Sequence, residues 1–193
     1  KIAPTIELRI REPYFRDNRR QAIIIRQIMV NKEKSEFEKD NKLSENYSVI
    51  NARYYNSKTE LIHHFSYSSD VQFSKNFGKI ASEIEYRKLF QSNRQINLRW
   101  YAGVFLYNKT NSDYFSFALD RPTDYLFDYN YYGRSESSGF FSQQYIQAEG
   151  GFKSKLSNPF ANQWMTTMNS SFNIWNWIEL YGDFGLIKNK NQS

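Results

Sequence analysis

One strand-length segment, INLRWYAGVFLYN at residues 96–108, sorts apolar from polar side chains by alternation. Successive side chains of a β-strand point to opposite faces. The apolar side chains that would share one face are Ile96, Leu98, Trp100, Ala102, Val104 and Leu106. Those that would share the other face are Asn97, Arg99, Tyr101 and Tyr107, with Phe105 as the exception. An apolar face of this length needs a cover, so the fold must place either a second protein layer or lipid against it.

The composition excludes several classes of protein. The 193 residues contain 18% aromatic residues and few Gly or Pro, which is not the composition of a disordered chain. The absence of cysteine excludes a disulfide framework and thiolate metal sites. The net charge is +6, but acidic residues are interleaved with the basic ones, so we expect no nucleic-acid partner. No run approaches the ~18 apolar residues of a transmembrane helix, which excludes a helical membrane protein.

Polar turns divide the chain into apolar or alternating runs that predict roughly ten strands. These runs cover residues 4–12, 20–30, 46–55, 59–67 with a continuation to 75, 79–90, 96–108, 113–119, 140–156, 163–175 and 177–187. The pattern predicts a turn at Asn56 and Ser57, a charged loop at 31–45 and an irregular segment at 120–139. Residues 1–45 would lead into the sheet, and 46–193 would form a regular antiparallel meander. The abrupt ends predict a chain truncated on both sides.

Three features favour lipid as the cover. The strands approach the ~9–11 residues that a membrane-spanning strand needs. Aromatic residues gather near the predicted strand ends, for example Trp175 and Trp177. Charged residues that would face the interior of a barrel are Glu83, Glu85, Arg87, Arg99, Glu149, Glu179 and Asp183. Residues that would face lipid are Ile96, Leu98, Trp100, Val104, Leu106, Ile178, Leu180, Phe184 and Leu186. A soluble antiparallel sheet predicts the same alternation, so the pattern alone leaves both open.

A resemblance favours the membrane. The segment FALDRPTDYLFDYNYYGRSESSGFFSQQYIQAEGGFKSKL, residues 117–156, resembles a C-terminal region of large Bacteroidetes outer-membrane proteins. Those proteins are M1-type (gluzincin) metallopeptidase-like chains fused to a β-barrel. REPYFRDNRRQAIIIRQIMVN at 11–31 and FGKIASEIEYRKLF at 77–90 fit the same region. The resemblance implies an all-β, up-and-down antiparallel meander that forms part of a barrel in the bacterial outer membrane. It also implies further strands after Ser193 and an upstream peptidase domain that would hold any zinc.

The chain itself offers little catalytic chemistry. A metallopeptidase of that class needs H-E-x-x-H on a helix, whereas the two histidines here, His63 and His64, are adjacent in a predicted strand. Adjacent strand residues point to opposite faces, so they cannot bind one metal ion. Glu60 would share a face with His64, but four strand residues span ~13 Å. We therefore expect no catalytic, cofactor or metal residues in this segment.

The irregular segment is the best candidate contact surface. Asp120, Asp124 and Asp128 recur at four-residue spacing, which could suit a calcium loop, although the EF-hand pattern is absent. Aspartates of this kind more often organise turns. Tyr129, Tyr131 and Tyr132 could stack on a partner or pack against a barrel rim.

Three functions remain open at this stage. The leading hypothesis is a membrane-anchoring barrel segment that contacts outer-membrane lipid and holds a peptidase-like domain or other surface proteins. The second is a porin-like barrel with a conducting interior. The third is a soluble β-sheet module that binds an anionic ligand or a nucleic acid through basic and aromatic residues.

Overall fold

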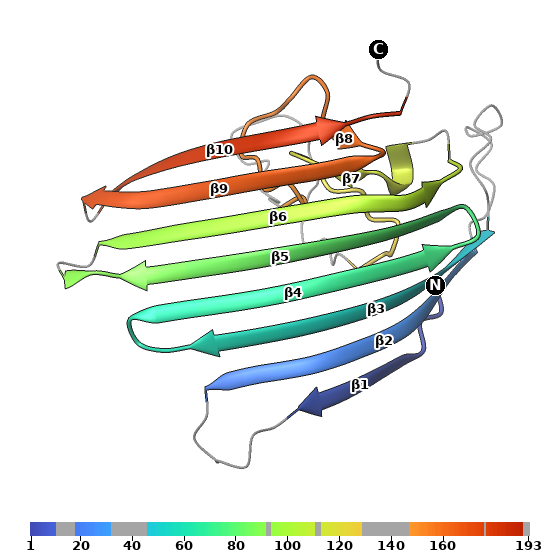
Figure 1. Cartoon of the computed structure of the whole chain (residues 1–193), viewed down its shortest axis with the longest axis horizontal. Helices are drawn as coiled ribbons and strands as arrows, with labels where there is room; N and C mark the ends of the chain where they lie inside the picture. Colours follow the sequence, from blue (N-terminus) through green and yellow to red (C-terminus); the bar gives the residue numbers. More distant parts are fainter. Residues whose placement is uncertain are drawn as a thin grey trace.

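The computed structural model describes residues 1–10, 18–31, 46–91, 94–110, 113–128, 147–175 and 177–190. Their main feature is one antiparallel sheet with the strand order β1-β2-β3-β4-β5-β6-β9-β10 (Figure 1). The strands are β1 (Thr5–Ile10), β2 (Arg19–Asn31), β3 (Asn46–Thr59), β4 (His63–Ser74), β5 (Phe77–Leu89), β6 (Gln95–Asn108), β9 (Trp164–Trp175) and β10 (Ile178–Lys188). The predicted all-β antiparallel meander is therefore confirmed. The edge strands β1 and β10 do not pair with each other, so the described sheet is open.

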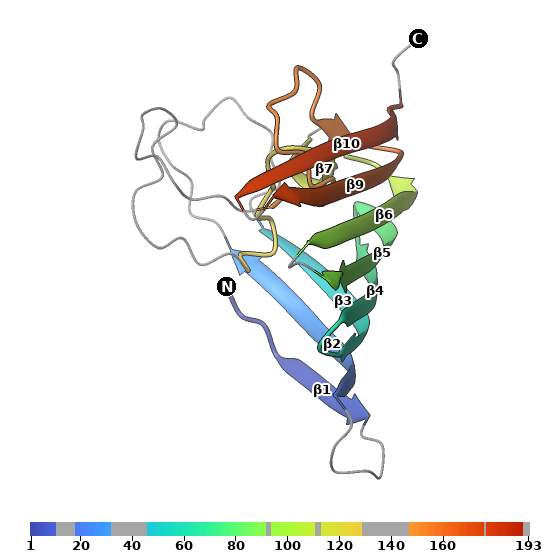
Figure 2. The ribbon, with the colours of Figure 1, turned by 90° about the vertical axis from the view of Figure 1, so that its left-hand side faces the viewer.

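A second group of residues lies on one side of this sheet. It contains a short 3-10 helix, η3 (Asp113–Phe115), and two short paired strands, β7 (Phe117–Ala118) and β8 (Phe160–Ala161). We call residues 113–128 and 147–161 the covering segment. Figure 2 views the sheet along its strands, with the described loops of this segment on one side only.

The cross-strand register gives the sheet two chemically different faces. On the first face, Trp100 lies opposite Ile84 on β5 and Met168 on β9, and Met168 lies opposite Phe184 on β10. We call it the apolar face. On the second face, Arg99 lies opposite Glu85 and Asn169. The covering segment packs on this second face, which we call the covered face.

The hydrophobic core lies between the covered face and the covering segment. Phe77 of the sheet contacts the rings of Phe115 and Tyr125, with ring centroids 4.9 Å and 6.0 Å apart. Phe105 contacts Phe117, with ring centroids 5.0 Å apart. The buried members of this core are Ile28, Val30, Tyr47, Val49, Phe77, Tyr101, Phe105, Phe115, Phe117, Leu119, Tyr125, Ala161 and Met165. The covered face thus combines an apolar end with a polar, charged remainder.

Three details of the sequence prediction were wrong. Strand β3 continues through Asn56 and Ser57 to Thr59, because β4 pairs with it along this whole length. Residues 113–119 do not form a long strand, and residues 147–156 contain no strand; the rest of the predicted strand 140–156 lies outside the described residues. The place beside β6 is taken by β9, which pairs with β6 from Ile96 to Val104.

Gly103 lets the covering segment approach the sheet closely. A Cβ at this position would lie 2.6 Å from a ring carbon of Phe117. We expect Gly103→Ala to destabilise the fold by about 1–3 kcal/mol, because overpacking forces rings off their rotamers. Gly182→Ala is the matched control, since its Cβ would meet only the Ser170 hydroxyl oxygen at 3.6 Å. Urea unfolding of both variants measures the difference, and equal stabilities would contradict this packing.

Candidate functional site: a charged network on the covered face

The predicted charged residues gather on one side of the sheet. Glu83, Glu85 and Arg87 of β5 occupy covered-face positions, and so does Arg99 of β6. Glu179 and Asp183 of β10 lie on the same face. Glu149 is not in a strand; it belongs to the covering segment and contacts the sheet from there.

Arg99 is the centre of the network. Its side chain is only 12% exposed, and its Nε donates to Glu83 Oε1 at 2.6 Å. Its Nη1 donates to Asn169 Oδ1 at 3.0 Å, and its Nη2 donates to the Glu149 carbonyl oxygen at 2.8 Å. One guanidinium therefore joins β5, β6, β9 and the covering segment. A planar fork of donors is suited to this role, and a lysine could not replace it.

Asn169 also holds residues 149–151 against the sheet. Its Nδ2 donates to the Gly150 carbonyl oxygen at 3.1 Å and to Asp183 Oδ1 at 2.9 Å. Gly151 has a φ of 70°, a conformation that side chains other than glycine rarely adopt. A Cβ there would lie 2.7 Å from both Arg99 Nη1 and Asn169 Oδ1. Glycine is thus required where the segment turns against the network.

Lys79 fastens the covering segment at a second point. The residue is only 3% exposed, and its Nζ donates to the Phe115 carbonyl oxygen at 3.2 Å. The ring centroids of Phe117 and Tyr125 lie 4.7 Å and 4.6 Å from the same nitrogen. Aromatic faces stabilise a cation that has lost its water, so the rings offset part of the burial cost.

Further side-chain contacts fasten residues 124–128. The Tyr125 hydroxyl donates to Gln72 Oε1 at 2.6 Å, and the Tyr47 hydroxyl donates to the Tyr125 carbonyl oxygen. Asp128 pairs with Arg26 of β2 at 2.6 Å and with Lys1 at 2.8 Å. Hydrogen bonds and ion pairs from strands β2 to β9 therefore hold the covering segment on the sheet, in addition to the hydrophobic core.

The Glu149 carboxylate is an ionisable group buried between the covering segment and the sheet. It accepts a hydrogen bond from the Ala118 N–H at 3.0 Å. Burial raises the pKa of Glu149 above its ordinary 4.5, although Lys79 and Arg99 oppose the change. Because the folded pKa lies above the unfolded one, the native state keeps this proton over a pH range in which the unfolded chain has lost it. The contribution of Glu149 to stability is thus greatest at low pH and is lost as pH rises through the folded pKa.

The raised pKa of Glu149 predicts how the stability of the protein changes with pH. We expect the free energy of unfolding of the native protein, relative to Glu149→Gln, to fall as pH rises above 4.5. Denaturant titrations of both proteins at a series of pH values give this difference. A difference that rises with pH over the same range would contradict a raised pKa at this site.

Two cavities adjoin the network. One of about 320 Å³ lies between the sheet and the covering segment and is lined by Arg26, Asp70, Lys79, Glu83 and Glu149 among others. The other, of about 310 Å³, is lined by polar residues that include Asn97, Lys153, Asn169 and Tyr181. Both are bordered by charged and amide side chains that already bond to one another.

The structure separates the residues considered for metal binding. His63 and His64 lie on opposite faces of β4; His63 contacts the Tyr86 hydroxyl at 3.2 Å and His64 contacts the Thr59 hydroxyl at 2.9 Å. Among the described residues, no group of three His, Asp or Glu side chains is placed to hold a metal ion.

The predicted contact loop is only partly within the described residues. Asp120 accepts from the Leu156 N–H at 2.6 Å and from Arg121, and Asp124 accepts from the Asp128 N–H at 2.8 Å. The Asp124 bond is the local turn chemistry expected of aspartate, whereas the Asp120 bond to Leu156 joins residues 36 apart in the chain. Tyr129, Tyr131 and Tyr132 lie outside the described residues.

Sequence reasoning missed Lys79, Asn169 and Tyr125. Lys79 has the same strand parity as Glu83 and Glu85, so alternation alone could have placed it on the charged face. No comparable signal marks Tyr125, because its role depends on how the covering segment folds back.

No known protein family, curated protein or solved structure shows significant similarity to this chain. Within the described residues, no helix combines the length and apolar character required to cross a membrane.

Proposed function

We propose that this chain forms part of the wall of a β-barrel in the bacterial outer membrane, with the apolar face against lipid and the covering segment held inside. Its role would be to anchor a larger, peptidase-like protein in the membrane. Any zinc chemistry would belong to residues outside this segment.

The observation that carries the proposal is the side on which the covering segment lies. A soluble sheet buries its apolar face under a second layer and leaves its polar face in water. Here the covering segment packs on the face that carries the core rings and the charged network, and no described segment covers the apolar face (Figures 1 and 2). Large side chains are left exposed there, with Phe184 at 64%, Leu180 at 58% and Leu106 at 53%. A large apolar face that no described segment covers is unusual for a soluble sheet and suits a lipid environment.

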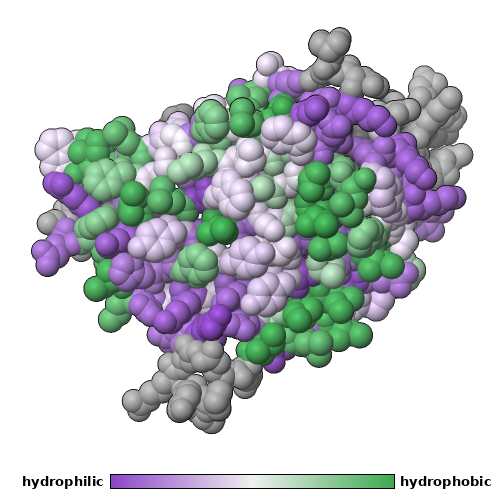
Figure 3. All heavy atoms as spheres, in the orientation of Figure 1, coloured by the Kyte–Doolittle hydropathy of each residue, from purple (hydrophilic) through white to green (hydrophobic). Residues whose placement is uncertain are grey.

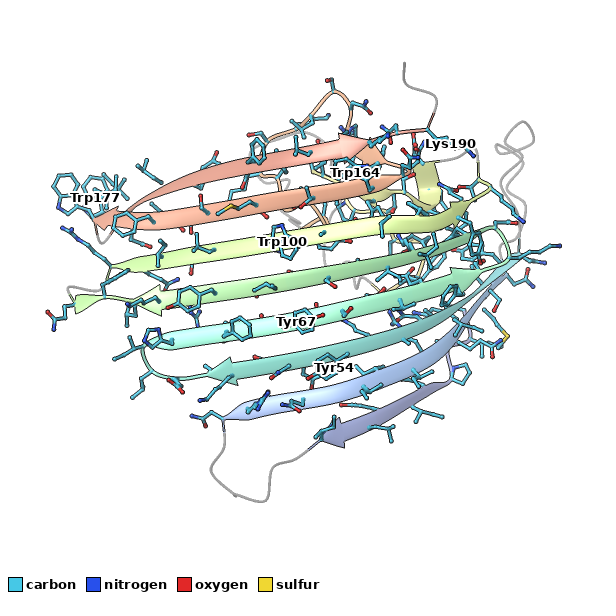
Figure 4. The ribbon with its side chains drawn as sticks, viewed as in Figure 1. Tyr54, Tyr67, Trp100, Trp164, Trp177 and Lys190 are labelled. Carbon is cyan, nitrogen blue, oxygen red and sulfur yellow. The ribbon has the colours of Figure 1, made fainter. Side chains whose placement is uncertain are left out.

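The composition of the apolar face supports the same proposal. Figure 3 views this face, where hydrophobic and pale aromatic residues occupy much of the centre. Figure 4 labels Tyr54, Tyr67 and Trp100 along the middle of the strands. The charged residues at apolar-face positions of the strands are Arg19, Lys58, Lys88 and Lys188. All of them are basic and lie at or next to a strand end, where a long side chain can reach the polar headgroups.

The alternatives are less well supported. A porin-like interior would need a water-filled path, whereas the core and the charged network hold the covering segment against the covered face. A soluble binding module would leave the apolar face in water. Conductance of the whole protein in a planar bilayer would favour the porin alternative, and its absence would favour a sealed interior.

Fractionation of the native protein tests the proposal. We expect the protein in the outer-membrane fraction, with a gel mobility in detergent that changes on boiling. A soluble protein with no change in mobility would contradict the proposal and favour the binding module.

A further inference from the structure

Basic residues cluster at one end of the apolar face. We call it the short-turn end, because the connections 60–62, 90–94 and 176–177 lie there, together with the longer connection 11–18. Arg19 lies opposite Lys58 across β2 and β3, and Lys88 lies opposite His63 across β5 and β4. The three cations therefore lie on β2, β3 and β5 near the same end of the apolar face, with His63 and Phe65 of β4 between Lys58 and Lys88.

Apolar and aromatic side chains project beside these cations. Leu61 is 99% exposed, and Trp177 is 82% exposed and stacks on Trp175 with ring centroids 6.5 Å apart. Lys88 Nζ lies 5.2 Å from the centroid of the Phe90 ring. Figure 4 shows Trp177 beyond the end of the sheet. Tryptophan and long basic side chains together are typical of the boundary between hydrocarbon and headgroups.

We propose that Arg19, Lys58 and Lys88 form a belt that binds the headgroups of anionic phospholipids. This inference rests on the proposed membrane function, because it places the adjoining apolar face in hydrocarbon. Two of the three belt cations have polar neighbours: Lys58 Nζ lies 2.8 Å from the Glu60 carboxylate, and Arg19 Nε donates to Asn56 Oδ1 at 3.1 Å. Glu60 is exposed in the turn, so a lipid phosphate can compete for this lysine from the membrane side. Each cation near an anionic surface contributes an attraction of its own.

The connections indicate which leaflet the belt meets. Outer-membrane barrels have short turns on the periplasmic side and longer loops outside. The opposite end of the sheet carries the long connections 32–45 and 109–163, together with one short turn at 75–76. The belt would therefore contact the periplasmic leaflet, and the covering segment would enter from the outside.

Charge-neutral variants of the whole native protein test headgroup binding. The belt variant is Arg19→Gln, Lys58→Gln and Lys88→Gln. Its control, Lys75→Gln, Lys109→Gln and Lys190→Gln, removes the same charge at the opposite end. We expect phosphatidylglycerol in phosphatidylcholine vesicles to raise the unfolding temperature of the native protein and the control. The belt variant should lose most of that rise. An equal rise in all three proteins, or none in the native protein, would overturn the belt.

Single cysteines test the leaflet, since the chain has none of its own. In intact cells, a membrane-impermeant maleimide should label Lys109→Cys but reach Leu61→Cys only after the outer membrane is permeabilised. The reverse labelling would overturn the assignment of the belt to the periplasmic leaflet while leaving the membrane proposal intact. If the protein were found in the soluble fraction, the proposed membrane function would fail, and the belt with it.

Discussion

Val104→Arg is expected to destabilise the protein in a bilayer by about 2–4 kcal/mol or to block its assembly, the cost of arginine deep in the lipid-facing surface of a barrel. Val104 lies on the apolar face opposite Ile80 and Trp164, and 44% of its surface is exposed. If water covered this face, a substitution at such an exposed position would change stability by only about 0.5 kcal/mol. Urea titration of the protein in phosphatidylcholine vesicles measures the effect.

Ser68→Arg is the matched control for that experiment. Ser68 lies on the covered face opposite Glu83, so an arginine there would meet a carboxylate beside a polar cavity. We expect a much smaller cost than at Val104. Equal costs at the two positions would contradict the assignment of lipid to one face only.

Arg99→Leu is expected to destabilise the protein by about 3 kcal/mol, the lower end of the cost of breaking a buried ion pair, because it leaves the partly buried Glu83 carboxylate without its counter-charge. Glu83 and the Glu149 carbonyl oxygen would both lose their donors. The change should also loosen the covering segment from the sheet. Hydrogen exchange at the Ala118 and Gly150 amides, which bond within that segment, should therefore become faster.

A double variant separates the effect of the Arg99–Glu83 ion pair from the loss of packing around the Arg99 side chain. We expect Arg99→Leu combined with Glu83→Leu to recover part of the loss, because no unpaired carboxylate remains. If the double variant lost the sum of the two single effects, the ion pair would not be the source of the stability.

The sheet could be predicted from sequence because its information is local. Alternation at residues 96–108 assigned each residue to a face, and the same rule placed Glu83, Glu85 and Asp183 together. The predicted lipid-facing residues, from Ile96 to Leu186, do share the apolar face. The lipid contact itself stays a prediction, which the variants above test.

The covering segment could not be predicted because its structure depends on distant contacts. Phe115, Phe117 and Leu119 alternate as in a strand, yet they pack into the core around a short 3-10 helix. The pairing of β6 with β9 skips more than fifty residues of chain, and no local pattern marks such a neighbour. Lys79 likewise gains its role only when the rings of Phe117 and Tyr125 close over it.

The most direct test of the central claim is a nitroxide scan along β6 in reconstituted protein, using single cysteines at residues 96–106 other than Arg99 and Gly103. We predict that labels at Leu98, Trp100, Ala102 and Val104 collide with oxygen dissolved in lipid and are shielded from a water-soluble nickel chelate. Labels at Asn97, Tyr101 and Phe105 should be shielded from oxygen in lipid. They should either be shielded from the nickel chelate as well or be accessible to the nickel chelate only. Free access of the nickel chelate to the first set, or no alternation along the strand, would contradict a lipid-facing sheet.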